Sequence, residues 1–467
     1  MNTQKRVWSG LALLLMASLV LAACGPATTP APAATSAPAA TSAPAATAAP
    51  SGEAVTLRYV MWDSAQLPPY QQCAEAFTAK NPNITISVEQ QGWDDYWNAI
   101  QTGFVAGDAP DVFTDHLAKY PEFAVKEQIM DIEPYVKRDN VDLSIYLPGL
   151  ADLWVREGKR YGLPKDWDTI AVFYNVEMFE KAGIDPAIMK EWTWNAQDGG
   201  TFEETIARLT LDDQGRNGLD PNFDKTKVVQ YGFIHQGGGG FAGQTQWSMF
   251  AVSNGFKFTD GPWTTKYYYD DPKLAETMVW YRGLIEKGYA PTVETLTGIG
   301  GDGYFLAGNG AMTTEGSWQV GNFLSNASFK VGFGLLPLGP NGRKSMFNGL
   351  ADSIYVGTQH PEEAWQWVKF LASPECANIV GDSAVVFPAQ QSGVERNLKT
   401  REAQGVDVTA FTDVALDPNA TFLFPITDNG SQIANIMTPV MDSIMLGQVD
   451  PAAALKQAND EVNALFK

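Results

Sequence analysis

Short runs of alternating hydrophobic and polar residues are interleaved along the chain with longer stretches of helical spacing. Residues 55–61 alternate like a half-buried strand, and residues 69–80 have the hydrophobic spacing of a helix. A second strand over 84–88, a helix over 93–106 and a third strand over 111–113 follow. Strands that alternate with helices predict an α/β fold in which a mostly parallel sheet is covered on both faces.

The same alternation continues toward the C-terminus. A buried strand is predicted over 170–174 and helices over 176–182, 272–287 and 361–371, before a mostly helical tail over 432–467. The pattern therefore favours one type of architecture along the whole globular part of the chain.

Ligands of such sheets bind at the carboxyl ends of the strands. The segments that directly follow the first three predicted strands are Trp62-Asp63-Ser64, Gly92-Trp93-Asp94 and Thr114-Asp115-His116. We expect a ligand site to draw on these segments.

The N-terminal region has the order of an export signal. Two basic residues precede an apolar stretch over 11–22, and Leu-Ala-Ala-Cys follows at 21–24. The apolar stretch is shorter than the roughly 20 residues that span a bilayer. The four residues at 21–24 resemble the bacterial lipobox, in which Cys24 is lipidated and becomes the new N-terminus. We predict a lipoprotein signal peptide over 1–23; an ordinary cleaved signal with an incidental cysteine is the alternative.

Residues 24–54 are predicted to form a solvated tether behind the lipidated cysteine. The stretch consists almost entirely of Pro, Ala, Thr and Ser and offers no aromatic side chain to a core. The protein is thus expected outside the cytoplasm, held at the cell membrane by its lipid, with a globular body after the tether.

The net charge of the chain limits the classes of partner that we expect it to bind. The chain has 32 Lys and Arg against 53 Asp and Glu, a formal net charge of −21. Such acidity argues against nucleic acid and against anionic lipid surfaces. No cluster of arginines indicates a cationic pocket.

Motifs for catalysis and metal binding are missing from the sequence. It contains no phosphate-binding loop, no nucleophile elbow and no zinc-protease motif. Residues 213–224 weakly resemble a calcium loop but lack several oxygen ligands and the closing glutamate. Cys73 and Cys376 lie on predicted helices, and either a disulfide or two buried thiols is compatible with the sequence. No cofactor and no metal is expected.

Several stretches, in order along residues 55–467, resemble the extracellular solute-binding proteins of sugar-importing ABC transporters, the family that includes maltose-binding protein. The stretches are Gly107–Val112, Tyr161–Pro164 with Thr169 and Phe173–Asn175, Met178–Phe179 with Ala182–Ile184, Gly310–Met312 with Gly316–Trp318, Pro337–Pro340, and Glu362–Trp365 with Phe370–Leu371 and Ser373–Glu375.

This resemblance implies a periplasmic-binding-protein-like fold of two α/β lobes that close on a ligand about a hinge. The first lobe would comprise 55–167 plus 351–399, and the second 168–350 plus 400–467. Crossings between the lobes would lie near 166–169, near 348–350 and around Thr400. The resemblance also implies a monomeric, non-catalytic protein that binds a small carbohydrate and delivers it to the transmembrane subunits of an ABC permease.

Sugar chemistry selects the candidate site residues. Aromatic rings stack on the apolar faces of a sugar, and carboxylates and amides hydrogen-bond its hydroxyls. The ligand-binding candidates are Trp62, Asp63, Trp93, Asp115, Asp166, Asp168, Trp247, Trp318 and Asn348, with Trp263, Phe387 and Phe424 in reserve. A tryptophan can instead belong to the core, and an aspartate after a strand can instead cap a helix.

Two other functions fit part of the pattern. An extracytoplasmic glycoside hydrolase would also combine carboxyls with tryptophans, but it needs two carboxyls at a defined separation. A lipid-anchored adhesin or scaffold would share the N-terminal region and would have no saturable site for a small ligand.

Overall fold

The computed structural model describes residues 53–467 of the chain. The predicted signal peptide, the lipidation site at Cys24 and nearly all of the predicted tether therefore lie outside the described residues. Within 53–467, none of the helices combines the length and the apolar character needed to span a bilayer.

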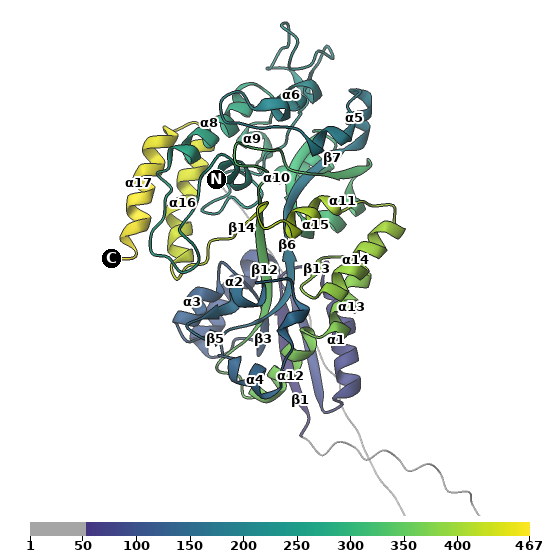
Figure 1. The fold of residues 1–467 in the computed structure, drawn as a ribbon, viewed down its shortest axis with the longest axis vertical. Helices are drawn as coiled ribbons and strands as arrows, with labels where there is room; N and C mark the ends of the chain where they lie inside the picture. Colours follow the sequence, from purple (N-terminus) through teal and green to yellow (C-terminus); the bar gives the residue numbers. More distant parts are fainter. Residues whose placement is uncertain (1–52) are drawn as a thin grey trace, which may run out of the picture. The chain divides into compact units, whose positions relative to one another are not determined.

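A seven-stranded sheet, called here the large sheet, contains the N-terminal strands (Figure 1). Its order is β13-β6-β12-β3-β1-β2, with β14 beside β12. The strands are β1 (Val55–Met61), β2 (Ile84–Gln90), β3 (Val112–His116), β6 (Leu163–Asp168), β12 (Ser345–Ile354), β13 (Phe387–Pro388) and β14 (Thr421–Leu423).

The large sheet is mixed, so the expectation of a mostly parallel sheet is wrong. Strand β1 runs parallel to β2 and β3, and β12 runs parallel to β14. Strand β12, however, is antiparallel to both β3 and β6, and β13 is antiparallel to β6. Local alternation predicted the first three strands well, but it carries no information on the direction of a strand that arrives more than 200 residues later.

Hydrophobic clusters cover both faces of the large sheet. Alternate residues of β1 point to opposite faces and pack in different clusters. Leu57 and Tyr59 pack in one hydrophobic cluster with residues of α1 (Leu67–Lys80) and α12 (Pro361–Leu371), whereas Val60 packs in another with residues of α2 (Trp93–Ala106). The other helices near this sheet are α3 (Tyr120–Val125), α4 (Glu133–Arg138), α13 (Pro374–Ser383) and α14 (Gln391–Ala403).

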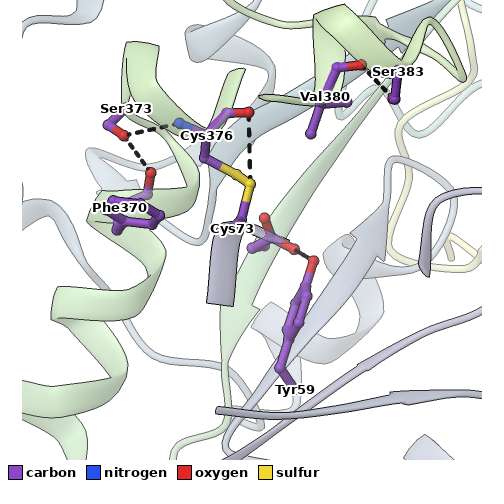
Figure 2. The surroundings of a disulfide bond; sticks show 8 residues. Tyr59, Cys73, Phe370, Ser373, Cys376, Val380 and Ser383 are labelled. Atoms are coloured by element: carbon purple, nitrogen blue, oxygen red, sulfur yellow. Dashed lines mark hydrogen bonds between the residues drawn. A yellow bond between two sulfur atoms is a disulfide. The ribbon is translucent and has the colours of Figure 1, made fainter. Parts of the chain in front are cut away.

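A disulfide joins Cys73 of α1 to Cys376 of α13 (Figure 2). Both cysteines are buried, and they are 303 residues apart in the sequence. Of the two possibilities that the sequence left open, the structure has the disulfide. A cross-link between such distant segments stabilises a fold mainly by restricting the unfolded chain.

A second, three-stranded antiparallel sheet, the small sheet, has the order β10-β7-β11. Its strands are β7 (Ile170–Asn175), β10 (Met312–Gly316) and β11 (Val331–Gly334). Thr169 alone separates β7 from β6 of the large sheet, and its hydroxyl donates to the carbonyl of Phe411 (2.9 Å). The chain therefore passes from one sheet to the other within a single residue.

Helices around the small sheet and two short hairpins, of which β4–β5 lies beside the large sheet, complete the fold (Figure 1). The hairpins are β4 (Val155–Arg156) with β5 (Lys159–Arg160), and β8 (Leu211–Asp212) with β9 (Val228–Gln230). The helices are α5 (Val176–Lys181), α6 (Gly200–Leu209), α7 (Ser248–Ser253), α8 (Pro272–Glu286), α9 (Val293–Leu296), α10 (Gly300–Leu306), α11 (Val320–Asn326), α15 (Thr409–Leu416), α16 (Gly430–Met445) and α17 (Pro451–Ala464).

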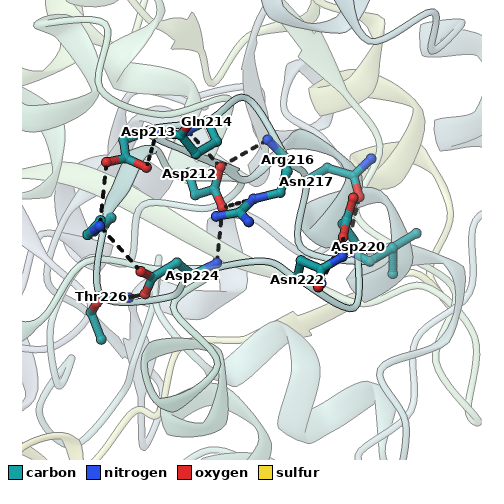
Figure 3. Close-up of polar contacts among 11 residues, drawn as sticks. Asp212, Asp213, Gln214, Arg216, Asn217, Asp220, Asn222, Asp224 and Thr226 are labelled. Carbon is teal, nitrogen blue, oxygen red and sulfur yellow. Dashed lines mark hydrogen bonds and ion pairs between the residues drawn. The ribbon is translucent and has the colours of Figure 1, made fainter.

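Carboxylates at the loop between β8 and β9 accept hydrogen bonds from other groups of the protein (Figure 3). Asp212 accepts hydrogen bonds from the backbone N–H groups of Gln214, Arg216 and Asp224, and from the guanidinium of Arg216 at 2.7 Å. Among residues 53–467, no group of three or more His, Cys, Asp or Glu is placed to hold a metal ion. Internal hydrogen bonds account for the acidic composition of this loop.

Candidate ligand-binding cavity

A cavity of about 1170 Å³ lies between elements of the two sheets. From the large sheet, it is lined by the segment after β1, the start of α2 and parts of β3, β6 and β12. From the small sheet, it is lined by the segment after β10 and by α11, and the α13–β13 and α14–α15 connections complete its wall. Its size slightly exceeds the roughly 300–1,000 Å³ of common small-molecule sites.

Most of the predicted site residues converge on this cavity. Those that line it are Trp62, Asp63, Trp93, Asp166, Asp168, Trp318 and Asn348. They come from five separate stretches of the sequence, so the fold brings them together. Asp115, Trp247 and the three reserve residues do not line the cavity.

Asp115 lies inside β3, because that strand extends to His116 and does not end at Phe113 as expected. Its carboxyl accepts from the backbone N–H of His116 (2.8 Å) and from the hydroxyl of Ser353 (3.1 Å). Burial, opposed by these hydrogen bonds, raises the pKa of Asp115 to about 8. The side chain belongs to the interior of the large sheet.

Trp247 belongs to the hydrophobic core. Its indole is fully buried and packs against Phe256 and Phe258, and its Nε1 donates to the carbonyl of Gly238 (3.1 Å). Among the reserve residues, Phe387 stacks on Trp167 at 4.8 Å, Phe424 packs against His116, and Trp263 contacts the guanidinium of Arg156.

An aromatic wall forms one side of the cavity. Trp62 and Trp93 meet edge to face with ring centroids 5.1 Å apart, and Tyr96 packs against Trp62 at 5.2 Å. Trp93 keeps 45% of its surface exposed, whereas Tyr96 is fully buried. The buried ring fixes the orientation of its neighbours, which leaves indole surface facing the cavity.

Trp318 faces the cavity from the small sheet, in the 3-10 turn after β10. Its ring lies against Gly316, where an added Cβ would be only 1.9 Å from Trp318 Cζ3. The glycine therefore makes room for the indole. Indole rings carried by the two sheets thus face the same cavity.

A polar cluster forms the floor. Asp168 at the end of β6 accepts from Gln244 Nε2 (2.9 Å) and from Asn348 Nδ2 (3.1 Å), and Asn348 also lies 3.0 Å from His116 Nε2. Neighbouring Asp166 has no hydrogen-bond partner for Oδ2 within the described chain, and the same holds for Asn348 Oδ1. The floor therefore has unused acceptor capacity.

Burial controls the charge of these groups. It raises the pKa of Asp168 well above the ordinary value, with Asp166 adding to the shift and Asn348 and Gln244 opposing it. It raises the pKa of Asp166 to about 7, against the charge of Lys165. It lowers the pKa of His116 to about 3, so the imidazole is neutral at pH 7. The Nδ1 atom of His116 accepts from the backbone N–H of Ala118 (2.9 Å).

The family model for bacterial extracellular solute-binding proteins matches residues 63–377, more than half of the chain. The chain belongs to this family. The match begins at Asp63 on the cavity wall and ends on α13, so it covers most of the elements that line the cavity.

This solute-binding protein is 23% identical over 485 residues to the galactooligosaccharide-binding protein of Bacillus subtilis, with 97% of this chain and 96% of that protein covered. Among solved structures, it resembles Mycobacterium tuberculosis UspC, with a TM-score of 0.70 at 27% identity, covering 88% of this chain and 100% of that one. It also resembles an ABC substrate-binding protein of Listeria monocytogenes in complex with cycloalternan, with a TM-score of 0.76 at 21% identity, covering 88% and 99%.

These likenesses confirm the predicted fold class of two α/β lobes. The family and the relatives are binding proteins, and sugar-binding proteins of ABC transporters are among them. The exact lobe boundaries and the individual ligand contacts stay predictions.

Sequence reasoning did not select several polar residues that line this solute-binding protein's cavity. They are Gln66, His116, Gln244, Ser317, Gln319, Asn322, Ser383, Arg401 and Gln404. His116 belongs to a segment that the strand pattern did indicate. Gln244 and Arg401 carry no local signal, because each reaches the cavity only through the packing of distant elements.

Proposed function

We propose that this protein binds a carbohydrate or a related polyhydroxylated solute outside the cytoplasmic membrane and delivers it to an ABC import permease. The observation that carries the proposal is the cavity in which tryptophans from both sheets face carboxyl and amide groups with unused acceptors. The sugar-binding relatives support the same class of ligand.

The chemistry of the cavity fits a polyol. Trp62, Trp93 and Trp318 offer ring faces to the apolar side of a sugar ring. Asp166, Asp168 and Asn348 offer oxygen atoms to its hydroxyls, and a typical hydrogen bond contributes about 0.5–1.5 kcal/mol. A ligand held in this way is gripped without any bond being broken, so the proposal is binding without catalysis.

Ligand would favour a closed form in which both lobes contact it. With lobes at the predicted boundaries, Trp62 and Trp93 belong to the first lobe, and Trp318 belongs to the second. The single residue Thr169 between β6 and β7, and the long strand β12, are suited to carry the hinge. The closed form would then dock on the permease.

Location outside the cytoplasm is part of the proposal. Lipidation of Cys24 would hold the protein at the membrane, and the 24–54 tether would set its distance from the surface. The Cys73–Cys376 disulfide supports an oxidising compartment, where such bonds persist.

A thermal-shift screen of sugars and polyols, neutral and acidic, tests the function. Ligand at 100 times its Kd stabilises the folded state by about 2.7 kcal/mol, which raises Tm. The best binder is then measured by calorimetry on the wild type, on Trp318→Ala and on Trp318→Phe. We expect Trp318→Ala to weaken binding at least about tenfold, equivalent to 1.4 kcal/mol, with partial recovery in Trp318→Phe.

Two results would reject this function. One is the absence of any stabilising sugar or polyol across the screen. The other is turnover of chromogenic glycosides by the mature protein, which would indicate a hydrolase.

A further inference from the structure

Arg401 occupies a distinctive place on the cavity wall. It lies in the last turn of α14 and is only 7% exposed, yet it lines the cavity. Among the described residues that line the cavity, it is the only lysine or arginine. The acidic residues of the wall, Asp63, Asp166 and Asp168, come from the segment after β1 and from β6.

The guanidinium of Arg401 has only neutral acceptors. Nη1 donates to Gln404 Oε1 (3.1 Å) and Nη2 to the carbonyl of Ala384 (2.5 Å). A guanidinium has five N–H donors, so these two contacts leave donors without a partner in the described chain. Burial lowers the pKa of Arg401, and no carboxylate opposes that effect.

Arg160, another buried arginine of this chain, has a carboxylate partner. It is 4% exposed, and its Nε forms an ion pair with Glu133 at 3.0 Å while Nη1 donates to the carbonyl of Ala151. Within residues 53–467, Arg401 forms no ion pair within 4.0 Å. Since a buried charge is costly unless it is paired, Arg401 is a cation that lacks its counter-ion.

The surroundings of Arg401 suit an anion from the cavity. Asn322 and Gln404, which also line the cavity, carry amide groups that can donate hydrogen bonds. At Gly321 of α11, an added Cβ would lie 3.8 Å from Arg401 Nη2, so this helix lies beside the guanidinium. A planar guanidinium binds carboxylate and phosphate oxygens in a bidentate manner.

We propose that Arg401 binds an acidic group, a carboxylate or a phosphate ester, on the saccharide that occupies the cavity. This inference rests on the proposed function and specifies it further: the solute is a glycoside with an anionic substituent. The substituent lies at Arg401, and the neutral rings lie against the tryptophans. The carboxylate of Asp63, next to Trp62, orients the solute, because it repels an anion at that end of the cavity.

Matched neutral and acidic solutes test the inference by calorimetry on the full protein. The probes are glucose, glucuronate and a glucose phosphate monoester, together with cellobiose and its terminal uronic acid. We expect an acidic member of a set to bind about 10–100-fold more tightly than its neutral partner, the range of a charge-assisted hydrogen bond. The uronic acids and the phosphate ester distinguish the two kinds of anion.

Two variants locate the effect. Arg401→Gln should remove the preference for the acid, while Arg401→Lys should retain part of the preference. Arg396→Gln is the matched control, since Arg396 lies on the same helix, is exposed and pairs with Asp382. The wild-type preference should also fall as salt rises.

The outcomes separate the inference from the function. Neutral solutes that bind as tightly as acidic ones would overturn the inference and leave the proposed function intact. A preference for the acid that persists in Arg401→Gln would remove Arg401 from the site. If neither class binds, the proposed function fails, and the inference fails with it.

Discussion

Buried aspartates at two places in this protein, Asp212 at the start of the β8–β9 loop and Asp166 with Asp168 on the cavity floor, have opposite electrostatic character. In the 212–224 loop, the carboxyl of Asp212 is surrounded by donors (Figure 3). On the cavity floor, Asp166 has an oxygen with no partner in the described chain, and Asp168 has only two amide donors. Both Asp212 and Asp168 are inaccessible or nearly so, so burial alone does not distinguish the groups.

The number of donors decides the direction of the pKa shift. At Asp212, burial raises the pKa, but the N–H groups of Asp224, Arg216 and Gln214 and the Arg216 guanidinium outweigh it and lower the pKa to about 2. At Asp168, burial prevails over its two donors and raises the pKa. A carboxylate whose acceptors are all used stabilises the fold, whereas one with acceptors to spare is available to a ligand.

Removal of the cavity carboxyl should have the largest effect on binding. In Asp168→Ala, a sugar hydroxyl loses its partner, which costs about 1–3 kcal/mol or about 10–100-fold in affinity. Tm at pH 8 should not fall, because the variant removes a group whose ionisation is unfavourable in the folded state. Calorimetry and thermal melts measure the two effects. Unchanged affinity would show that Asp168 does not contact the solute.

The matched substitution in the loop should have the opposite pattern. Asp212→Asn replaces a carboxylate oxygen by an amide nitrogen that faces N–H donors and the Arg216 guanidinium. We expect Tm to fall by several degrees while sugar affinity stays at the wild-type value. A variant that bound sugar poorly at a temperature where it is folded would contradict the assignment of Asp212 to the fold alone.

The pattern of the sequence placed Asp63 at the cavity but misplaced Asp115. Asp63 and Trp62 follow β1 directly, and because carboxyl ends of strands line ligand sites, local alternation was enough to place them at the cavity. Asp115 was misplaced because β3 continues through polar Thr114 to His116. Pairing with β12, which lies more than 200 residues away in the sequence, buries those polar positions.

Other positions depend on packing that no local pattern reports. The sequence analysis selected both Trp247 and Trp318 as ligand-binding candidates. Trp247 is buried among phenylalanines, whereas Trp318 faces the cavity. Arg401 is a cavity residue only because α14 packs beside Ala384 and Gly321, segments distant from it along the chain. Residue types thus indicated the chemistry of the site, but tertiary contacts determine which residues line the cavity.

The raised pKa values predict that stability falls as pH rises above neutrality. Burial raises the pKa of Asp115 to about 8, of Asp166 to about 7 and of Asp352 to about 6, compared with about 4 in an unfolded chain. Each group therefore contributes stability that is fully present below about pH 4 and is lost as pH rises to its folded-state pKa. The loss from Asp352 is complete near pH 6, so Asp115 and Asp166 account for the decline above pH 6.5. Tm should drop by a few degrees between pH 6.5 and pH 8.5.

Histidines limit this trend at lower pH. Burial lowers the pKa of His116 to about 3 and of His235 to about 4, so their contribution is present above about pH 6.5 and is lost as pH falls toward these values. Melts of Asp166→Asn across the same range sharpen the comparison, since the variant should have a flatter decline than the wild type above pH 6.5. A Tm that increases from pH 6.5 to 8.5 would contradict the raised carboxyl pKa values.

The smallest effect on binding is expected for Gly316→Ala, which tests the position of the Trp318 ring and leaves the cavity carboxyls unchanged. The backbone of Gly316 (φ −90°, ψ 160°) suits any residue, so Gly316→Ala introduces no backbone strain. Its methyl group would instead displace the Trp318 ring, which now lies 1.9 Å from that position. Loss of a well-placed ring contact costs about 0.5–1.5 kcal/mol, or about 2–10-fold in affinity. In a Trp318→Ala background the same substitution should have no further effect, because the ring that it displaces is gone. An equal loss in both backgrounds would show that Gly316 acts on the cavity by another route.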